Sequence, residues 1–233
     1  MSGPRVFGII AFRNEEKHLP GLLSHVRDYV DGFIAFDDCS TDSSFAIARN
    51  EQKMLGIFQR KTPSSDHHFE VQNREALLRA AHRHGANWVL CCDADERFET
   101  RFLEQMRSVC ASPPARVIGL RLVAAWENLQ TYRVGKAFKY VLFPAIDPKP
   151  YYRRGLLHQP WYPPTLEKSP KKLLDYYVYH LGSLTRADRE ERFIKFERID
   201  PHHRHQPQGY RNLIDESDLT LAPIPPERQF RYE

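Results

Sequence analysis

Two aspartates one residue apart, Asp93 and Asp95, directly follow a short apolar stretch, and Glu96 comes next. Carboxylates spaced in this way repel one another, and a bound cation relieves the repulsion. Mg²⁺ and Mn²⁺ prefer carboxylate and water oxygens and keep positions open for phosphate oxygens. The cluster therefore indicates a divalent cation site. From this motif alone, the alternative is a set of solvated loop acids that cap the following helix.

The acids are expected at the carboxyl end of a buried strand. Residues 87–92 form a short apolar run that predicts a strand, and residues 100–110 carry apolar side chains at helical spacing. In an open α/β sheet, such a strand-to-helix loop lies at the edge where ligands bind. We therefore examined which other segments lead to the same edge.

The first 112 residues alternate between apolar runs and amphipathic segments. Nearly continuous apolar runs are typical of parallel strands that are covered on both faces. This order predicts an α/β fold of the Rossmann-like type, with a mostly parallel central sheet flanked by helices. The expected strands are residues 5–12, 32–36, 56–60 and 87–92, and the expected helices are residues 19–30, 40–54 and 69–84.

Polar clusters also follow the first two strands. Asn14 and Glu15 come after the first strand, and Asp37 and Asp38 come after the second. By the same strand-order argument, both clusters lie at the edge that carries the two aspartates described above. The chain has no glycine-rich phosphate loop, so a nucleotide at this edge would be held by side chains and a metal.

The second half of the chain is less regular and is expected to form a smaller part of the same domain. Its segment 147–170 is rich in proline, tyrosine and arginine and has no clear period. A polar helix is expected from Thr185 to Ile199, with Asp188 at the capping-box position. The proline-rich tail, residues 201–233, is expected to wrap the surface or to be partly mobile. Further strands are expected at residues 116–125, 138–143 and 173–181.

The composition fits a globular protein. The 233 residues are 41% hydrophobic and carry a formal net charge of +4, and no run of 18 apolar residues occurs. We therefore expect a cytoplasmic protein without a membrane span, and without the basic patches of a nucleic-acid binder. The four cysteines lack metal-ligand spacing. Cys91 and Cys92 are expected on opposite faces of one strand, as reduced thiols.

Four motifs occur in an order that resembles the family 2 glycosyltransferases of the GT-A fold. They are Arg13-Asn14-Glu15-Glu16, Asp37-Asp38-Cys39-Ser40-Thr41-Asp42, Asn73-Arg74 and Asp93-Ala94-Asp95-Glu96. The resemblance is strong over residues 5–110 and continues weakly to about residue 200, through Tyr179-His180-Leu181-Gly182. One departure is Cys39, where the family commonly has a glycine.

The resemblance implies a metal-dependent transfer of a sugar from a nucleoside diphosphate to a carbohydrate or other hydroxyl acceptor, with inversion. Residues 1–112 would bind the nucleotide sugar, and residues 113–200 would bind the acceptor. A divalent cation, Mn²⁺ or Mg²⁺, would be held by Asp93, Asp95 and His180, with Asp95 the direct ligand. The implied donor-binding residues are Asn14, Glu15, Asp38 or Asp37, Arg74 and Asp93. We add His158 as a donor-site candidate from its own sequence context.

An inverting reaction requires a carboxylate that deprotonates the acceptor. Glu127, just past the strand that ends near residue 125, is our candidate, and the neighbouring Trp126 is a candidate platform for a sugar ring. The alternative is that Glu127 is a surface acid and Trp126 belongs to the core. Asp147 and Glu167 are the other candidate bases.

Two other functions fit the same elements. A sugar-phosphate nucleotidyltransferase uses a similar sheet and metal, but usually has a glycine-rich, basic loop after the first strand, which residues 13–16 do not resemble. A non-catalytic module that binds a nucleotide sugar could keep the fold, but retention of both motif aspartates and of His180 argues for an enzyme.

Overall fold

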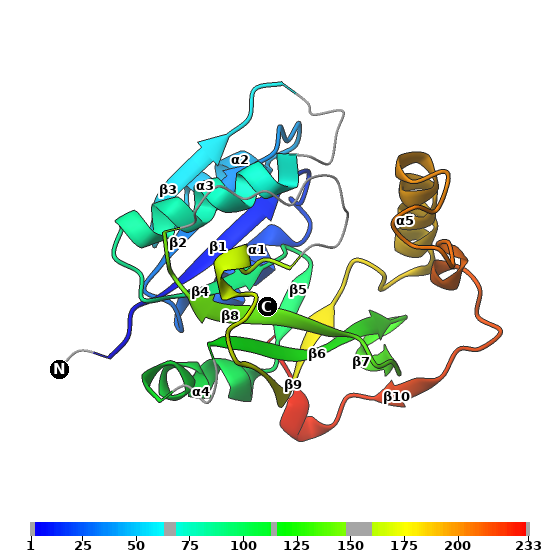
Figure 1. Ribbon diagram of the computed structural model, residues 1–233. Helices are drawn as coiled ribbons and strands as arrows, with labels where there is room; N and C mark the ends of the chain where they lie inside the picture. Colours follow the sequence, from blue (N-terminus) through cyan, green and yellow to red (C-terminus); the bar gives the residue numbers. More distant parts are fainter. Residues whose placement is uncertain (1–2, 63–68, 113–115, 148–159, 232–233) are drawn as a thin grey trace.

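The computed structural model describes residues 3–62, 69–112, 116–147 and 160–231. A large mixed sheet crosses the molecule, and helices pack on both of its faces (Figure 1). Within this part of the chain, no helix combines the length and apolar character needed to cross a membrane.

The strands are β1 (Val6–Phe12), β2 (Gly32–Asp37), β3 (Met54–Gln59), β4 (Trp88–Cys92), β5 (Glu96–Phe98), β6 (Val117–Trp126), β7 (Asn128–Arg133), β8 (Phe138–Pro144), β9 (Lys171–His180) and β10 (Leu221–Pro223). The α-helices are α1 (Leu19–Arg27), α2 (Ser44–Arg49), α3 (Phe69–Arg83), α4 (Thr100–Ala111) and α5 (Arg186–Ile199).

The sheet confirms the predicted mixed α/β architecture. Its strand order is β10-β7-β6-β8-β4-β1-β2-β3, and β3, β2, β1 and β4 run parallel. Strand β8 joins antiparallel to β4, and β6 joins antiparallel to β8. Strand β9 pairs parallel with β6 and antiparallel with the short β5. The second half of the chain thus extends the first-half sheet and does not form a separate one.

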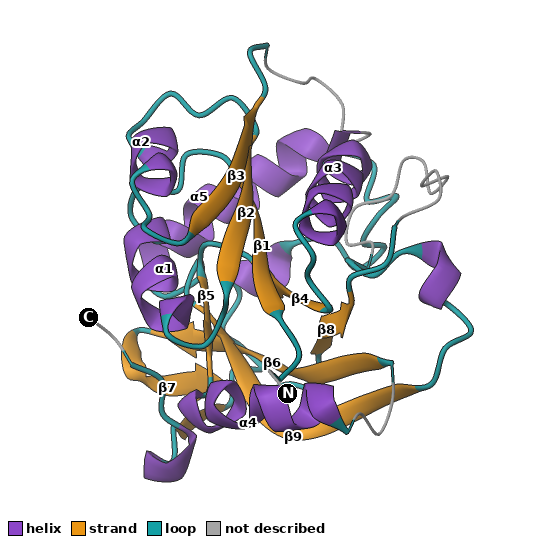
Figure 2. Ribbon diagram, turned by 90° about the vertical axis from the view of Figure 1, so that its left-hand side faces the viewer, coloured by secondary structure: helices purple, strands orange, loops and turns teal. Residues whose placement is uncertain are grey.

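Alternation along the parallel strands explains why they are apolar throughout. In β1, Val6 and Ile10 pack into one cluster with α1 and α4, while Phe7 and Ile9 pack into another with α3. Figure 2 shows α1 and α2 on one side of β1, β2 and β3, and α3 on the other. Because both faces of β1, β2 and β4 are covered, nearly all of their side chains are buried, whereas β3 at the edge of the sheet is only partly buried.

Cys91 and Cys92 of β4 show the same alternation between the two faces of the sheet. Cys91 belongs to the cluster under α3 and Cys92 to the cluster under α1 and α4, so the predicted opposite orientation is confirmed. All four cysteines are free thiols, and burial raises the pKa of both Cys91 and Cys92. These two cysteines therefore act as small apolar residues.

The tail wraps the second half of the molecule, as its sequence predicts. Tyr210 stacks on Phe196 of α5 with ring centroids 4.9 Å apart, and Phe230 packs on Tyr179 of β9 at 4.9 Å. The tail also adds β10 to the edge of the sheet beside β7, which the sequence did not predict. These contacts fix β9 and α5, which both supply site residues.

Candidate functional site

The loops after β1 and β2 are joined by hydrogen bonds at the carboxyl edge of the sheet. The backbone N–H of Asn14 donates to Ser40 Oγ at 3.0 Å, and Asn14 Oδ1 accepts from the Thr41 N–H at 2.8 Å. The N–H of Glu15 donates to Ser44 Oγ at 2.7 Å. Asn14 has a φ of 55°, a left-handed conformation that asparagine tolerates better than most residues. The first two polar clusters therefore form one rigid unit.

The two acids after β2 have different surroundings. Asp37 is fully buried and accepts hydrogen bonds from the Ser40 N–H at 2.9 Å and from Gln59 Nε2 at 3.0 Å. Asp38 pairs with Arg60 at 2.6 Å and its side chain is 26% exposed. Asp37 therefore stabilises the loop through hydrogen bonds, and Asp38 is the acid that a ligand could reach.

Cys39, the departure from the family pattern, follows these acids with a φ of 64°. That backbone region favours glycine, so the glycine common in the family and this cysteine meet the same conformational demand.

The motif after β4 continues directly into a strand. Asp93 and Asp95 lie in a tight turn, and Glu96 begins β5 where we expected a simple loop. In the β5–β9 ladder, Glu96 lies opposite His180, and the Leu181 N–H donates to the Asp95 carbonyl at 2.7 Å. This ladder brings His180 Nε2 to 3.0 Å from Asp95 Oδ2, although the two residues are far apart in the sequence.

The Asp95 carboxylate is surrounded by positively charged and neutral donors. Arg192 Nη1 of α5 lies 3.3 Å from Asp95 Oδ2. Burial alone would raise the pKa of Asp95, but attraction by His180 and Arg192 outweighs it and lowers this pKa well below its usual range. Burial, together with repulsion from Asp95, raises the pKa of Glu15 to about 7. The first and third polar clusters are therefore close enough to interact electrostatically.

Gly182 packs against the contact between Asp95, His180 and Arg192. A Cβ at residue 182 would overlap Asp95 Oδ2 and would lie 2.8 Å from Arg192 Nη1 and 3.0 Å from His180 Cε1. Only a residue without a side chain permits Asp95, His180 and Arg192 to meet here.

Two buried cations that the sequence did not indicate hold the motif. Lys139 Nζ of β8 lies 2.6 Å from Asp93 Oδ2 and 2.6 Å from Glu96 Oε2. Arg97 of β5 donates to the carbonyl groups of Ala94 at 3.1 Å, Glu96 at 2.7 Å and His18 at 3.0 Å. The turn that carries the aspartates is therefore fixed from both sides.

The remaining predicted residues lie in more than one place. Arg74 is only 9% exposed and packs over the Trp161 ring, with its guanidinium carbon 4.8 Å from the ring centroid. Trp126 is 2% exposed and Arg189 covers its ring at 3.9 Å, so the sugar-platform interpretation is wrong and the core interpretation is confirmed. His158 lies outside the described residues.

Glu127 lies beside this tryptophan, with a half-exposed side chain. Its Oε1 is 2.5 Å from Arg189 Nη2, and its N–H donates to the Leu184 carbonyl at 2.8 Å. Its φ of 60° turns the chain sharply between β6 and β7. Of the other candidate bases, Glu167 lies beside Lys171.

Asp95 and His180 fit a divalent cation as two adjacent ligands. Ligands at right angles around a cation, each bound at about 2.1 Å, are about 3 Å apart, and these two atoms are 3.0 Å apart. No group of three or more histidine, cysteine, aspartate or glutamate side chains in the described ranges could hold a metal ion. The other ligands would have to be water and the oxygens of a bound anion.

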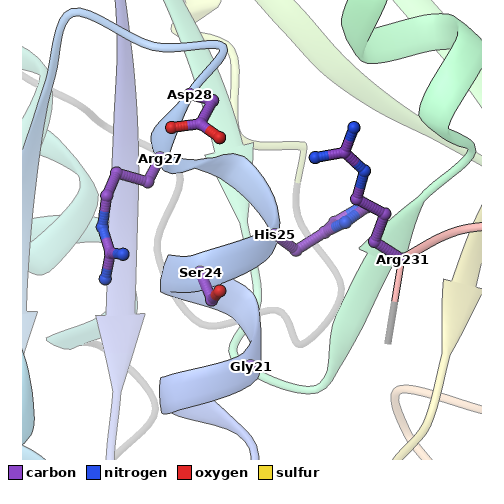
Figure 3. A pocket seen from close by; sticks show the side chains of 6 residues that line it. All are labelled: Gly21, Ser24, His25, Arg27, Asp28 and Arg231. Carbon is purple, nitrogen blue, oxygen red and sulfur yellow. The ribbon is translucent and has the colours of Figure 1, made fainter. Parts of the chain in front are cut away.

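A separate cavity of about 140 Å³ lies near the C-terminal end of α1 (Figure 3). It is lined by Gly21, Ser24, His25, Arg27, Asp28 and Arg231, and contains none of the acids of the strand-end clusters. His25 Nε2 donates to the Phe98 carbonyl at 2.8 Å, and burial lowers the pKa of His25 to about 4. A neutral His25 therefore donates from Nε2.

Comparisons with known proteins agree with this geometry. The model of the family described as Glycosyl transferase family 2 matches residues 9–176. A structure of S. aureus TarS has a TM-score of 0.53 and 14% sequence identity, over 91% of this chain and 44% of that chain. A structure of S. aureus TarS 1–349 in complex with UDP has a TM-score of 0.51 and 15% identity, over 91% and 70%. A search of curated proteins gave no match. At these identities the structures support the GT-A fold, and this chain spans less than half of the longer TarS chain.

Proposed function

Because the chain belongs to glycosyl transferase family 2, we propose that it moves a sugar from a nucleoside diphosphate to a hydroxyl group of an acceptor. One observation carries this proposal: acids from the ends of β1, β2 and β4 lie at one edge of the sheet, where Asp95 meets His180. A nucleoside diphosphate presents a base, a ribose and a diphosphate, and the three clusters offer separate partners for them.

The donor would be recognised along this edge. Asp38, with Arg60 beside it, would accept hydrogen bonds from the base, while the Asn14 and Glu15 loop would contact the base or the ribose. Asp93 is the candidate partner of the ribose. UDP is the first nucleotide to test, since the TarS structure of the same fold contains it.

The leaving group requires positive charge. As the bond from sugar to phosphate breaks, negative charge grows on the departing diphosphate, and fixed cations stabilise that charge more in the transition state than in the ground state. Arg192, held near Asp95, supplies one such charge. A divalent cation bound by Asp95 and His180 would supply Lewis-acid stabilisation of the same oxygens.

Inversion would require a base on the face of the sugar opposite the diphosphate. Glu127 is our candidate, since it is the exposed carboxylate at the β6–β7 turn. Its ion pair with Arg189 fixes its position. General-base assistance typically contributes about 10² to 10⁴ in rate, which is the loss expected when the carboxylate is removed.

Titration calorimetry with UDP, GDP and dTDP, each with and without Mn²⁺, tests the donor assignment. We expect one of these nucleotides to bind, more tightly with Mn²⁺, and we expect Asp95→Asn to remove the Mn²⁺ dependence. Asp218→Asn is the matched control, because Asp218 is an exposed acid outside the site. Failure of all three nucleotides to bind, in the presence of Mn²⁺, would refute the proposed function.

Enzymatic turnover is tested by slow hydrolysis of the donor sugar in the absence of acceptor. A transferase hydrolyses its donor slowly, and Asp95→Asn should abolish that release of nucleoside diphosphate while the protein stays folded. Binding without any hydrolysis or transfer would favour a non-catalytic module, and release of pyrophosphate from a nucleoside triphosphate and a sugar phosphate would favour a nucleotidyltransferase.

A further inference from the structure

The two aspartates of the motif have partners of different chemistry. Asp93 and the neighbouring Glu96 share the ammonium group of Lys139, at 2.6 Å from each. Asp95 instead faces the imidazole of His180 at 3.0 Å, and the more distant Arg192 Nη1 lies 3.3 Å from the same oxygen. An ammonium group has three donors and no lone pair, so it cannot ligate a metal, whereas a neutral imidazole is a common metal ligand.

Lys139 lies inside the protein. Its side chain is 13% exposed and that of Glu96 is 2% exposed. A buried ammonium is costly unless it is paired and hydrogen-bonded, and here two carboxylates meet that requirement.

The position of Lys139 is set by the sheet. Lys139 lies near the start of β8, which pairs antiparallel with β4 at Leu90 and Leu142 and so runs back toward the motif. The Asp93 N–H also donates to Glu96 Oε2 at 3.1 Å, which closes the turn around the ammonium. The cation is therefore part of the fold and sits where two carboxylates would otherwise attract a metal ion.

We propose that Lys139 is an internal counter-ion of the donor site, which keeps Asp93 and Glu96 from ligating the metal and leaves Asp95 and His180 to hold it. Asp93 then remains free to turn its second oxygen toward the donor, and Lys139 acts as a positioning residue. This inference rests on the proposed function for its context, and it adds Lys139 to the residues that the family resemblance implies for this site.

Electron paramagnetic resonance of free and bound Mn²⁺ tests the inference, on the full chain without nucleotide and again with UDP. Asp93→Asn should change the Mn²⁺ dissociation constant by less than about threefold, whereas Asp95→Asn should raise it by about tenfold or more. Lys139→Met exposes two carboxylates to the cation and should tighten Mn²⁺ binding by about tenfold or more. Lys139→Arg, which keeps the charge, is the matched control and should bind Mn²⁺ as the natural protein does.

Each outcome of these measurements either supports or overturns the inference. Equal losses of Mn²⁺ affinity in Asp93→Asn and Asp95→Asn would overturn the inference, as would an unchanged affinity in Lys139→Met. If Lys139→Met does not fold, the comparison of the two aspartate variants decides alone. If the natural protein binds no Mn²⁺, binding by Lys139→Met supports the inference and its absence overturns it. Calorimetry with UDP reports on the proposed function independently of these results.

Discussion

Replacement of Gly182 by alanine should disable the site while the fold survives. The new methyl group would overlap Asp95 Oδ2, and it would also press on Arg192 and His180 at 2.8 and 3.0 Å. To restore ordinary van der Waals contact, the carboxylate must retreat by about 1 Å, and the added packing strain should lower the free energy of unfolding by about 1–3 kcal/mol. A displacement of about 1 Å in a reacting group can cost about 10²-fold in rate, or about 2.7 kcal/mol of transition-state stabilisation.

The assay for Gly182→Ala is the rate of donor hydrolysis or transfer, together with calorimetry for Mn²⁺-dependent nucleotide binding. Gly135→Ala is the matched control, because no atom lies within 4 Å of the added Cβ there, and both measurements should stay unchanged. A folded Gly182→Ala protein with natural activity and natural Mn²⁺ dependence would refute the assigned role of the Asp95 contact.

Three other substitutions test separate parts of the account. Asp37→Ala should lower the free energy of unfolding by about 1–3 kcal/mol, because it removes a fully buried acceptor and with it two hydrogen bonds that hold the loop, whereas Asp38→Ala should chiefly weaken nucleotide binding. Urea unfolding and calorimetry distinguish the two variants, and the reverse pattern would show that we exchanged their roles. The pKa of His25 is about 4 in the folded protein and 6.5 in the reference state, so the unfolded chain binds more protons between these values and stability falls as pH drops. From pH 6.5 to pH 5, this loss is about 2 kcal/mol, and His25→Gln should remove it in urea unfolding at both pH values; an equal loss in the variant would contradict this assignment. Glu127→Gln should lower the transfer rate about 10²- to 10⁴-fold and leave donor binding intact, and a natural transfer rate would exclude Glu127 as the base.

The sequence predicts the first half of the fold well, because periodicity is a local signal. The parallel strands β1, β2 and β4 are buried on both faces and read as continuous apolar runs. The capping box at Thr185 and Asp188 correctly marks the start of α5. By contrast, β5 has three residues and β10 has three, which is too short for a period of two to appear.

The site was less predictable, because its contacts join distant segments. The pairing of Asp95 with His180 depends on the β5–β9 ladder, and only the family resemblance suggested that residue 180 belonged to the site. Lys139 lies in β8, and the pattern of apolar and polar residues along that strand does not indicate a role for residue 139. Arg192 is one of several charged residues in a polar helix, and spacing does not indicate which of them reaches back to the sheet.

Trp126 shows a further limit of reading a motif by residue type. An aromatic residue beside an acid suggests a sugar-binding surface, but the structure places Arg189 on that ring and buries both side chains. No feature of the sequence distinguishes Arg189 from the other charged residues of α5, so the burial of this pair could not be predicted.

A crystal of the protein soaked with Mn²⁺ and UDP tests the central claim most directly. We expect an anomalous difference peak within coordination distance of Asp95 Oδ2 and His180 Nε2, with the uracil toward Asp38 and the diphosphate on the metal. A nucleotide bound at another surface, such as the cavity at the end of α1, with Asp95 and His180 still in direct contact and no metal peak between them, would contradict it.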